Sequence, residues 1–343
     1  MSGIENHVYA DKETREEVDR QMNMVLETLL EYKALTIEQI IDMVLGGDAR
    51  RGYHIVEKLK KRRLIRAERV PGSYKSKYLV LTKKGAEILI DKPKLHEYYV
   101  RKEMVNKVIS ENEICRILHN CNVETIIPRR EALEIIKLGP SETSLKWLFK
   151  ANGLYATYMR ISGIKSPIEK SIRNAPTLDG HIIVYTNNKQ YRDDRRAWLK
   201  RLPGPGIYQV TFDKLPYLLS VLKEPAAHMA EFTQKLTKFV SSGKIIQLND
   251  APVKFAWQKG GTQMLLCDLT TGDLTGPALL IPYGKQELKE RGWGDGVIFY
   301  VDDKRTARTW SYLLKHREYN YFITKSDTVL YGVKDGKLVQ MAQ

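Results

Sequence analysis

The sequence has few cysteines, no long apolar run and no hydrophobic leader. Its three cysteines, at positions 115, 121 and 267, are too few and too scattered for a disulfide framework, which fits a reducing compartment. No apolar stretch approaches the roughly 20 residues that a bilayer-spanning helix needs. Residues 1–15 are polar and acidic and lack the apolar core of a signal peptide. We therefore expect a cytoplasmic protein with no membrane partner.

Acidic side chains are also in the minority. Lys and Arg number 56 against 41 Asp and Glu, a net charge of +15 that favours a polyanionic partner. The excess is concentrated, because residues 48–84 hold thirteen Lys or Arg and three acids, a net +10. We expect a polyanion site in this stretch, with a merely solvated charged surface as the alternative. The length of 343 residues and the 43% hydrophobic content predict two or three domains with a substantial core.

Residues 14–63 carry the signals of three helices. Thr14–Glu17 and Thr36–Gln39 have the pattern of capping boxes, in which side chains satisfy the free N–H groups of a helix start. Gly46 and Gly47 are expected to end the second helix, and Asp48 to cap the third. The sequence therefore predicts helices over residues 14–32, 37–44 and 49–63.

The third expected helix has a packing face and a cationic face. At 100° per residue its apolar or small residues fall on one side, namely Gly52, Ile55, Val56 and Leu59. An adjoining side gathers Arg50, Arg51, His54, Lys58, Lys61 and Arg62. A helix that is buried on one side and cationic on the other suits the DNA major groove, where Arg and Lys reach phosphates and guanine edges.

A β-hairpin is expected after this helix. Residues 64–70 and 77–82 are rich in β-branched and aromatic side chains and flank a Pro–Gly turn, and a short helix follows them. The tip of the hairpin is expected to touch the DNA backbone or minor groove. The predicted double-stranded DNA contacts are Arg50, Arg51, Tyr53, His54, Lys58, Lys61, Arg62, Ser73, Tyr74, Lys75 and Lys77.

The order helix, helix, basic helix, hairpin, helix resembles that of winged helix-turn-helix DNA-binding domains. The wording of the sequence is similar too, in Leu64–Arg66 before the wing and in Tyr78–Gly85 after it. We therefore expect a winged helix-turn-helix domain over residues 14–91. Some winged helices bind protein instead of DNA, and the local charge of +10 argues against that alternative here.

A long helix is expected next, because Asp91–Pro93 breaks the pattern and residues 94–119 have helical periodicity. We interpret residues 92–120 as a connector or dimerisation helix, with a homodimer as the expected assembly and a packed linker as the alternative. Cys115, His119 and Cys121 supply three of the four ligands of a structural zinc site, and no second cluster completes the set. No metal or cofactor is predicted.

Residues 121–343 alternate between short strands and helices, which predicts an α/β domain with a mixed sheet and an α+β chain overall. The predicted strands are residues 123–127, 154–158, 181–186, 206–211, 244–248, 253–257, 264–269, 297–301 and 319–324. The predicted helices are residues 129–138, 193–201, 214–222, 226–240 and 305–315.

Two stretches of this domain, about 181–222 and 297–337, share the order strand, polar pair with Lys, Trp-bearing helix, strand. An internal duplication explains this order, and the α/β pattern alone is the alternative. Asp295 and Asp302–Lys304 loosely suggest a nuclease core that holds Mg²⁺. Asn187 and Asn188 stand at the equivalent positions of the first stretch and are poor ligands for hard cations. We favour helix N-caps as the role of these polar pairs and predict no catalytic residue.

A winged helix with the Leu81–Gly85 exit, joined by a long helix to a degenerate-looking α/β domain, resembles the replication-relaxation family of plasmid and mobile-element proteins. In that family the C-terminal part looks related to nuclease folds, often without an evident active site. The resemblance implies a non-enzymatic DNA-binding protein that acts in replication, relaxation or maintenance of a plasmid or mobile element. The alternatives are a winged-helix transcription regulator with a ligand- or partner-sensing C-terminal domain, and a Mg²⁺-dependent nuclease targeted by the winged helix.

Overall fold

The chain folds into two units, residues 1–123 and 124–343, and the computed structural model describes residues 3–73, 75–161, 168–200, 206–239 and 243–341. Both units combine helices with β-structure, and the second contains mixed sheets, so the expectation of a mixed α+β chain is confirmed. Among the described residues, no helix has both the length and the apolarity that crossing a membrane requires.

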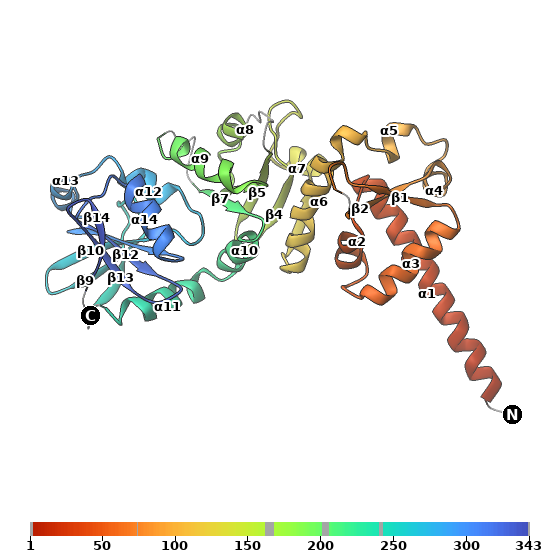
Figure 1. Cartoon of the computed structure of the whole chain (residues 1–343), viewed down its shortest axis with the longest axis horizontal. Helices are drawn as coiled ribbons and strands as arrows, with labels where there is room; N and C mark the ends of the chain where they lie inside the picture. Colours follow the sequence, from red (N-terminus) through yellow and green to blue (C-terminus); the bar gives the residue numbers. More distant parts are fainter. Residues whose placement is uncertain (1–2, 74, 162–167, 201–205, 240–242, 342–343) are drawn as a thin grey trace. The chain divides into compact units, whose positions relative to one another are not determined.

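The first unit packs helices around one antiparallel hairpin (Figure 1). Its elements are α1 (Gly3–Tyr32), α2 (Ile37–Val44), α3 (Ala49–Lys61), β1 (Ile65–Arg69), β2 (Lys77–Leu81), α4 (Lys83–Glu87), α5 (Leu95–Tyr98), the 3-10 helix η1 (Lys102–Met104) and α6 (Val105–Asn120). Strands β1 and β2 pair from Ile65 opposite Leu81 to Arg69 opposite Lys77. The predicted second and third helices, the hairpin and the short helix after it are confirmed.

Local caps fix where the helices of this unit begin. The Thr36 hydroxyl accepts a hydrogen bond from the Gln39 N–H, and the Gln39 side chain accepts one from the Thr36 N–H, which is the predicted capping box. Asp48 accepts a hydrogen bond from the Arg51 N–H at the start of α3, also as predicted. The prediction that the first helix starts at Thr14 is wrong. Helix α1 starts at Gly3, because residues 4–13 contain neither Pro nor Gly to interrupt it.

Two glycines allow close packing in the first unit. A Cβ atom at Gly52 of α3 would lie 2.4 Å from Cγ1 of Ile41 on α2. A Cβ atom at Gly85 of α4 would lie 2.1 Å from the carbonyl oxygen of Leu64, so only glycine fits this close approach to the backbone. Helix α3 faces the core with the residues that its periodicity predicts, Gly52, Ile55, Val56 and Leu59.

The prediction of one continuous helix over residues 94–119 is wrong. The chain instead forms α5, an extended turn, η1 and α6. Tyr98 and Val100 are both buried, and in a continuous helix two residues that far apart in sequence point about 200° away from each other. The break between α5 and η1 therefore lets both side chains enter the core.

Helix α6 packs against the N-terminal helices of its own unit. Arg116 of α6 lies 2.5 Å from the carboxylate of Asp42 on α2. The buried amide of Asn112 donates to the carbonyl oxygen of Ala34, at 2.8 Å. The residues predicted to form a connector or dimerisation helix thus belong to the first unit, and the homodimer stays a prediction.

The second unit contains a five-stranded and a seven-stranded mixed sheet (Figure 1). The five-stranded sheet has the order β3-β4-β5-β6-β7, and the seven-stranded sheet β14-β13-β12-β11-β10-β9-β8. The strands are β3 (Thr125–Pro128), β4 (Trp147–Lys150), β5 (Leu154–Arg160), β6 (Gly180–Tyr185), β7 (Ile207–Thr211), β8 (Lys244–Gln247), β9 (Phe255–Lys259), β10 (Thr262–Asp268), β11 (Gly296–Val301), β12 (Asn320–Thr324), β13 (Leu330–Lys334) and β14 (Lys337–Gln340). The helices are α7 (Arg129–Ile135), α8 (Ile168–Asn174), α9 (Asn188–Trp198), α10 (Leu215–Lys223), α11 (Pro225–Leu236), α12 (Thr275–Leu280), α13 (Lys285–Glu290) and α14 (Lys304–Leu313).

The two sheets repeat one pattern of strand directions. In the first sheet β3, β4 and β5 pair antiparallel, and β5, β6 and β7 pair parallel. In the second sheet β8, β9 and β10 pair antiparallel, and β10, β11 and β12 pair parallel. Helices connect the parallel strands in both, with α9 between β6 and β7 and α14 between β11 and β12. This shared order favours the predicted internal duplication, which stays a prediction.

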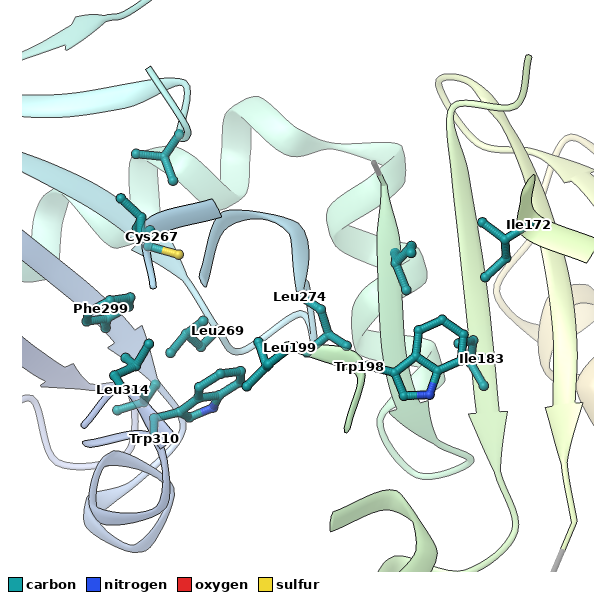
Figure 2. Packing of buried hydrophobic residues seen from close by; sticks show 14 of the residues in the cluster. Ile172, Ile183, Trp198, Leu199, Cys267, Leu269, Leu274, Phe299, Trp310 and Leu314 are labelled. Carbon is teal, nitrogen blue, oxygen red and sulfur yellow. The ribbon is translucent and has the colours of Figure 1, made fainter. Parts of the chain in front are cut away.

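One hydrophobic core serves both sheets of the second unit. It includes Ile183 of β6 and Phe299 of β11, together with side chains of the connecting helices. Leu199, which follows α9, and the fully buried Trp310 of α14 both belong to this core, and Figure 2 shows them next to each other. Helices α9 and α14 therefore meet between the two sheets.

Candidate nucleic-acid interface

The exposed side of α3 carries most of the predicted DNA contacts. Arg50, His54, Lys61 and Arg62 are exposed, and Arg51 and Lys58 are partly exposed. Tyr53 is 52% exposed, which is unusual for a large aromatic side chain. Because the opposite face of α3 lies in the core, these side chains are held on one outward surface.

Two arginines at the edge of this surface pair with carboxylates of α1. Nη2 of Arg51 lies 3.0 Å from Oε1 of Glu17, and Nη1 of Arg62 lies 3.5 Å from Oδ1 of Asp19. A hydrogen bond from Arg20, with further attraction from Arg51, lowers the pKa of Glu17. Arg51 and Arg62 must therefore exchange a carboxylate for any other anion that they bind. The cations of α3 and the hairpin that make no ion pair with the described residues include Arg50, Lys58, Lys61, Lys75 and Lys77.

The hairpin lies beside the exposed side of α3. Glu57 of α3 accepts a hydrogen bond from Lys60 at 2.5 Å. This hydrogen bond, with further attraction from Lys60, Lys61 and Lys77, lowers the pKa of Glu57. Because Lys77 belongs to β2, its influence on Glu57 places the start of that strand near the cations of α3. At least one cation of the hairpin therefore lies close to the exposed side of α3.

The hairpin adds two exposed lysines to the candidate interface, one from the loop between β1 and β2 and one from the start of β2. Lys75 and Lys77 are exposed. Oγ of Ser73 accepts a hydrogen bond from the N–H of Ser76 at 3.0 Å, so the Ser73 hydroxyl shapes the turn. The predicted contact of Tyr74 lies outside the described residues.

We define the basic surface as six cations of α3 and the hairpin, namely Arg62 and the five without an ion pair among the described residues: Arg50, Lys58, Lys61, Arg62, Lys75 and Lys77. Ammonium and guanidinium groups that are fixed on a folded scaffold bind a row of phosphates by ion pairing and release its counterions. Exposed Tyr53 and His54 add an aromatic ring and an imidazole to the same side of α3. This surface therefore has the charge that pairing with phosphates requires.

The carboxylates considered for a nuclease site do not come together. Asp295 and Asp302 flank the six-residue strand β11, so they are about 20 Å apart along the chain. Asp303 caps α14 by accepting a hydrogen bond from the Thr306 N–H at 2.7 Å, and Asn187 caps α9. The interpretation of these two residues as helix N-caps is confirmed.

The cysteines considered for zinc are not arranged as ligands in the structure. Among the described residues, no group of three or more His, Cys, Asp or Glu side chains is placed to hold a metal ion. The buried Sγ of Cys115 lies 3.6 Å from the hydroxyl of Tyr32. Burial raises the pKa of this thiol to about 12, which disfavours the thiolate that a metal requires.

Comparison with known proteins finds no match for this chain among protein-family models, curated proteins or solved structures.

Proposed function

We propose that the first unit is a winged helix-turn-helix domain and that the protein binds double-stranded DNA through it. In this proposal α2 and α3 are the helix-turn-helix, β1 and β2 are the wing, and α3 is the recognition helix. The order of the elements supports it, and so does the close contact of α4 with the backbone before β1, where Gly85 meets Leu64.

The observation that carries the proposal is the division of α3 into two faces. Its apolar face is buried against α1, α2 and the hairpin, so the helix cannot turn. Its other face presents four cations of the basic surface, and Lys75 and Lys77 of the hairpin supply the other two. A major groove about 12 Å wide admits one α-helix, and phosphates line both of its edges. A rigid helix with cations along its exposed side matches that geometry.

The position of each residue along α3 suggests its role in the proposed complex. Arg50, Tyr53 and His54 lie in the first turns, where recognition helices contact base edges. The guanidinium of Arg50 suits the O6 and N7 acceptors of guanine. Lys61 and Arg62, at the end of the helix, suit phosphates, which fix the register without reading sequence.

Reversing two unpaired charges of α3 tests the proposal. The variant Arg50→Glu with Lys61→Glu changes exposed side chains, so its far-ultraviolet circular dichroism is expected to match that of the wild type. Losing one base contact and one phosphate contact and adding two repulsive charges should weaken binding to a duplex by about 100-fold or more. Fluorescence anisotropy with a labelled duplex measures this change.

The matched control variant is Lys254→Glu with Lys337→Glu, which changes the net charge equally on exposed lysines of the second unit. Its affinity for the duplex should stay within about threefold of the wild type, because the proposed contacts all lie on the first unit. Equal losses in the two double variants would mean that net charge, and not the face of α3, determines binding.

We further propose that the DNA target lies on a plasmid or another mobile element, in its replication, relaxation or maintenance region. This proposal is supported only by the arrangement of a DNA-binding unit followed by a mixed-sheet unit. Crosslinking in cells followed by sequencing of the bound fragments tests it. Binding concentrated at promoters would instead support a transcription regulator.

A further inference from the structure

A buried arginine lies where α9 and α14 meet in the second unit. Arg195 of α9 is 7% exposed. Its guanidinium carbon lies 4.3 Å from the ring centre of Tyr191 and 4.9 Å from that of Trp310 on α14. Two aromatic rings therefore hold the guanidinium in place.

The hydrogen-bond donors of Arg195 are uncommitted. Its Nε is buried without a hydrogen-bond partner, and its guanidinium makes no ion pair or hydrogen bond with the described residues. Nε1 of Trp310 is likewise buried without a partner. Buried donors of native proteins are nearly always satisfied. Among the described residues, the guanidinium of Arg195 is therefore held by ring contacts and not by a carboxylate or carbonyl oxygen.

A cavity opens at this arginine. It has a volume of about 320 Å³ and is lined by Arg192, Arg195, Arg308, Thr309, Tyr312 and Leu313. Three of these described lining residues are arginines and none is an acid. The carboxylate that influences Arg195 electrostatically is that of Asp302, which is already paired with Lys214. The described lining of the cavity is therefore positively charged and contains no carboxylate.

We propose that this cavity binds a phosphoryl group, with Arg195 as the central contact and Arg192 and Arg308 on either side. A guanidinium donates two parallel N–H groups to two oxygens of a phosphate. Among the described residues, no carboxylate makes such a pair with Arg195. The hydroxyl of Thr309, at the wall of the cavity, already donates to the carbonyl oxygen of Arg305 at 3.0 Å, so the donors for a ligand are those of the arginines. The volume accommodates a phosphate monoester or one phosphodiester of a nucleic-acid backbone.

The alternative is that Arg195 only joins the two helices by stacking between aromatic rings, and the test must separate the two roles. Arg192 and Arg308 are exposed, so replacing both with Gln changes the cavity and leaves the packed core intact. Lys189→Gln with Arg305→Gln is the matched control, because it removes two exposed cations from the same two helices without touching the cavity. Arg195→Lys keeps the charge and removes the fork.

Thermal unfolding measures binding of inorganic phosphate, with chloride at matched ionic strength as the reference. Phosphate at about 100 times its Kd stabilises the folded protein by about 2.7 kcal/mol, a rise in Tm of about 5 °C. We expect this rise in the wild type and in the Lys189→Gln, Arg305→Gln control. It should fall by at least half in Arg192→Gln, Arg308→Gln and in Arg195→Lys. Equal rises in every variant, or none in the wild type, would overturn the proposal.

A second arm identifies the source of the phosphoryl group and does not depend on DNA binding by α3. A duplex is titrated into the Arg50→Glu, Lys61→Glu protein, with and without the two Gln substitutions of the cavity. Binding that disappears with the Gln substitutions assigns the cavity to a DNA phosphate. If the duplex does not bind but inorganic phosphate does, the cavity belongs to a small phosphorylated molecule.

Discussion

Asp273 makes the stability of the second unit depend on pH in an unusual direction. Its carboxyl group lies after β10, where the N–H of Thr275 donates to it at 2.8 Å. Burial raises the pKa of Asp273 to about 6, and the nearby charge of Asp268 adds to this effect. Between about pH 4 and pH 6 the folded chain therefore binds a proton that the unfolded chain has released.

The sign and size of the effect follow from this difference. Because the pKa of Asp273 is higher in the folded chain, the stabilising contribution of its proton is fully present below the unfolded pKa. This contribution is lost as the pH rises through the folded pKa. The rise from the ordinary value of 3.8 to about 6 corresponds to about 3 kcal/mol at pH 7. Asp273→Asn keeps an oxygen that accepts from Thr275 and removes the charge. We expect the free energy of unfolding of Asp273→Asn, relative to that of the wild type, to increase by about 3 kcal/mol as the pH rises from 4 to 7.

Guanidinium unfolding followed by tryptophan fluorescence measures this difference, because every tryptophan of the chain lies in the second unit, at positions 147, 198, 257, 293 and 310. The substitution of an exposed carboxylate, Asp250→Asn, is the control. A difference between Asp273→Asn and the wild type that stays constant from pH 4 to pH 7 would refute the reasoning.

Three further predictions concern other residues. Gly85→Ala should destabilise the first unit by about 2 kcal/mol, because its Cβ would lie 2.1 Å from the Leu64 carbonyl oxygen; circular dichroism detects the loss, and an unchanged melting curve would contradict it. Burial lowers the pKa of His181 to about 4, so its contribution to stability should fall by up to about 3 kcal/mol from pH 6.5 to pH 4; the difference in unfolding free energy between the wild type and His181→Asn should change by that amount, and a constant difference would contradict it. Glu17→Gln should raise duplex affinity about threefold or more at low salt by freeing Arg51, and unchanged affinity would exclude Arg51 as a contact.

Local signals in the sequence predict much of the first unit. The capping box at Thr36, the N-cap at Asp48 and the buried positions of α3 depend on residues within about one turn of one another. Their interactions form wherever the helix forms, so the sequence is sufficient to find them. The break between α5 and α6 has a different origin. It depends on the burial of Tyr98 and Val100 by side chains distant in sequence, which no local pattern contains.

The predicted strands of the second unit all have counterparts in the structure, whereas β4, β13 and β14 were not predicted. Strand β14 is short and mostly exposed, and its place in the sheet comes from backbone pairing with β13. Strand β4 carries a run of buried residues without alternation because both of its faces are covered, and it pairs with a strand on each edge. Pairing with distant segments, and not local propensity, defines these strands.

The candidate interface shows a similar division. Helical periodicity places the cations of α3 on one side, and the structure agrees. It does not reveal that Arg51 is paired with Glu17, which lies 34 residues earlier. Arg195 was missed because it stands in a highly charged stretch that resembles a solvated surface. Only the packing of α9 against Trp310 makes this arginine buried and unpaired.

The salt dependence of duplex binding tests the central claim most directly. If the six cations of the basic surface each engage one phosphate, the logarithm of affinity falls with the logarithm of salt with a slope of about −5. Affinity should then drop by about a thousandfold between about 50 and about 200 mM monovalent salt. Fluorescence anisotropy at several salt concentrations gives this slope. A duplex affinity that does not change over this range, or no binding at the lowest salt concentration, would contradict the claim.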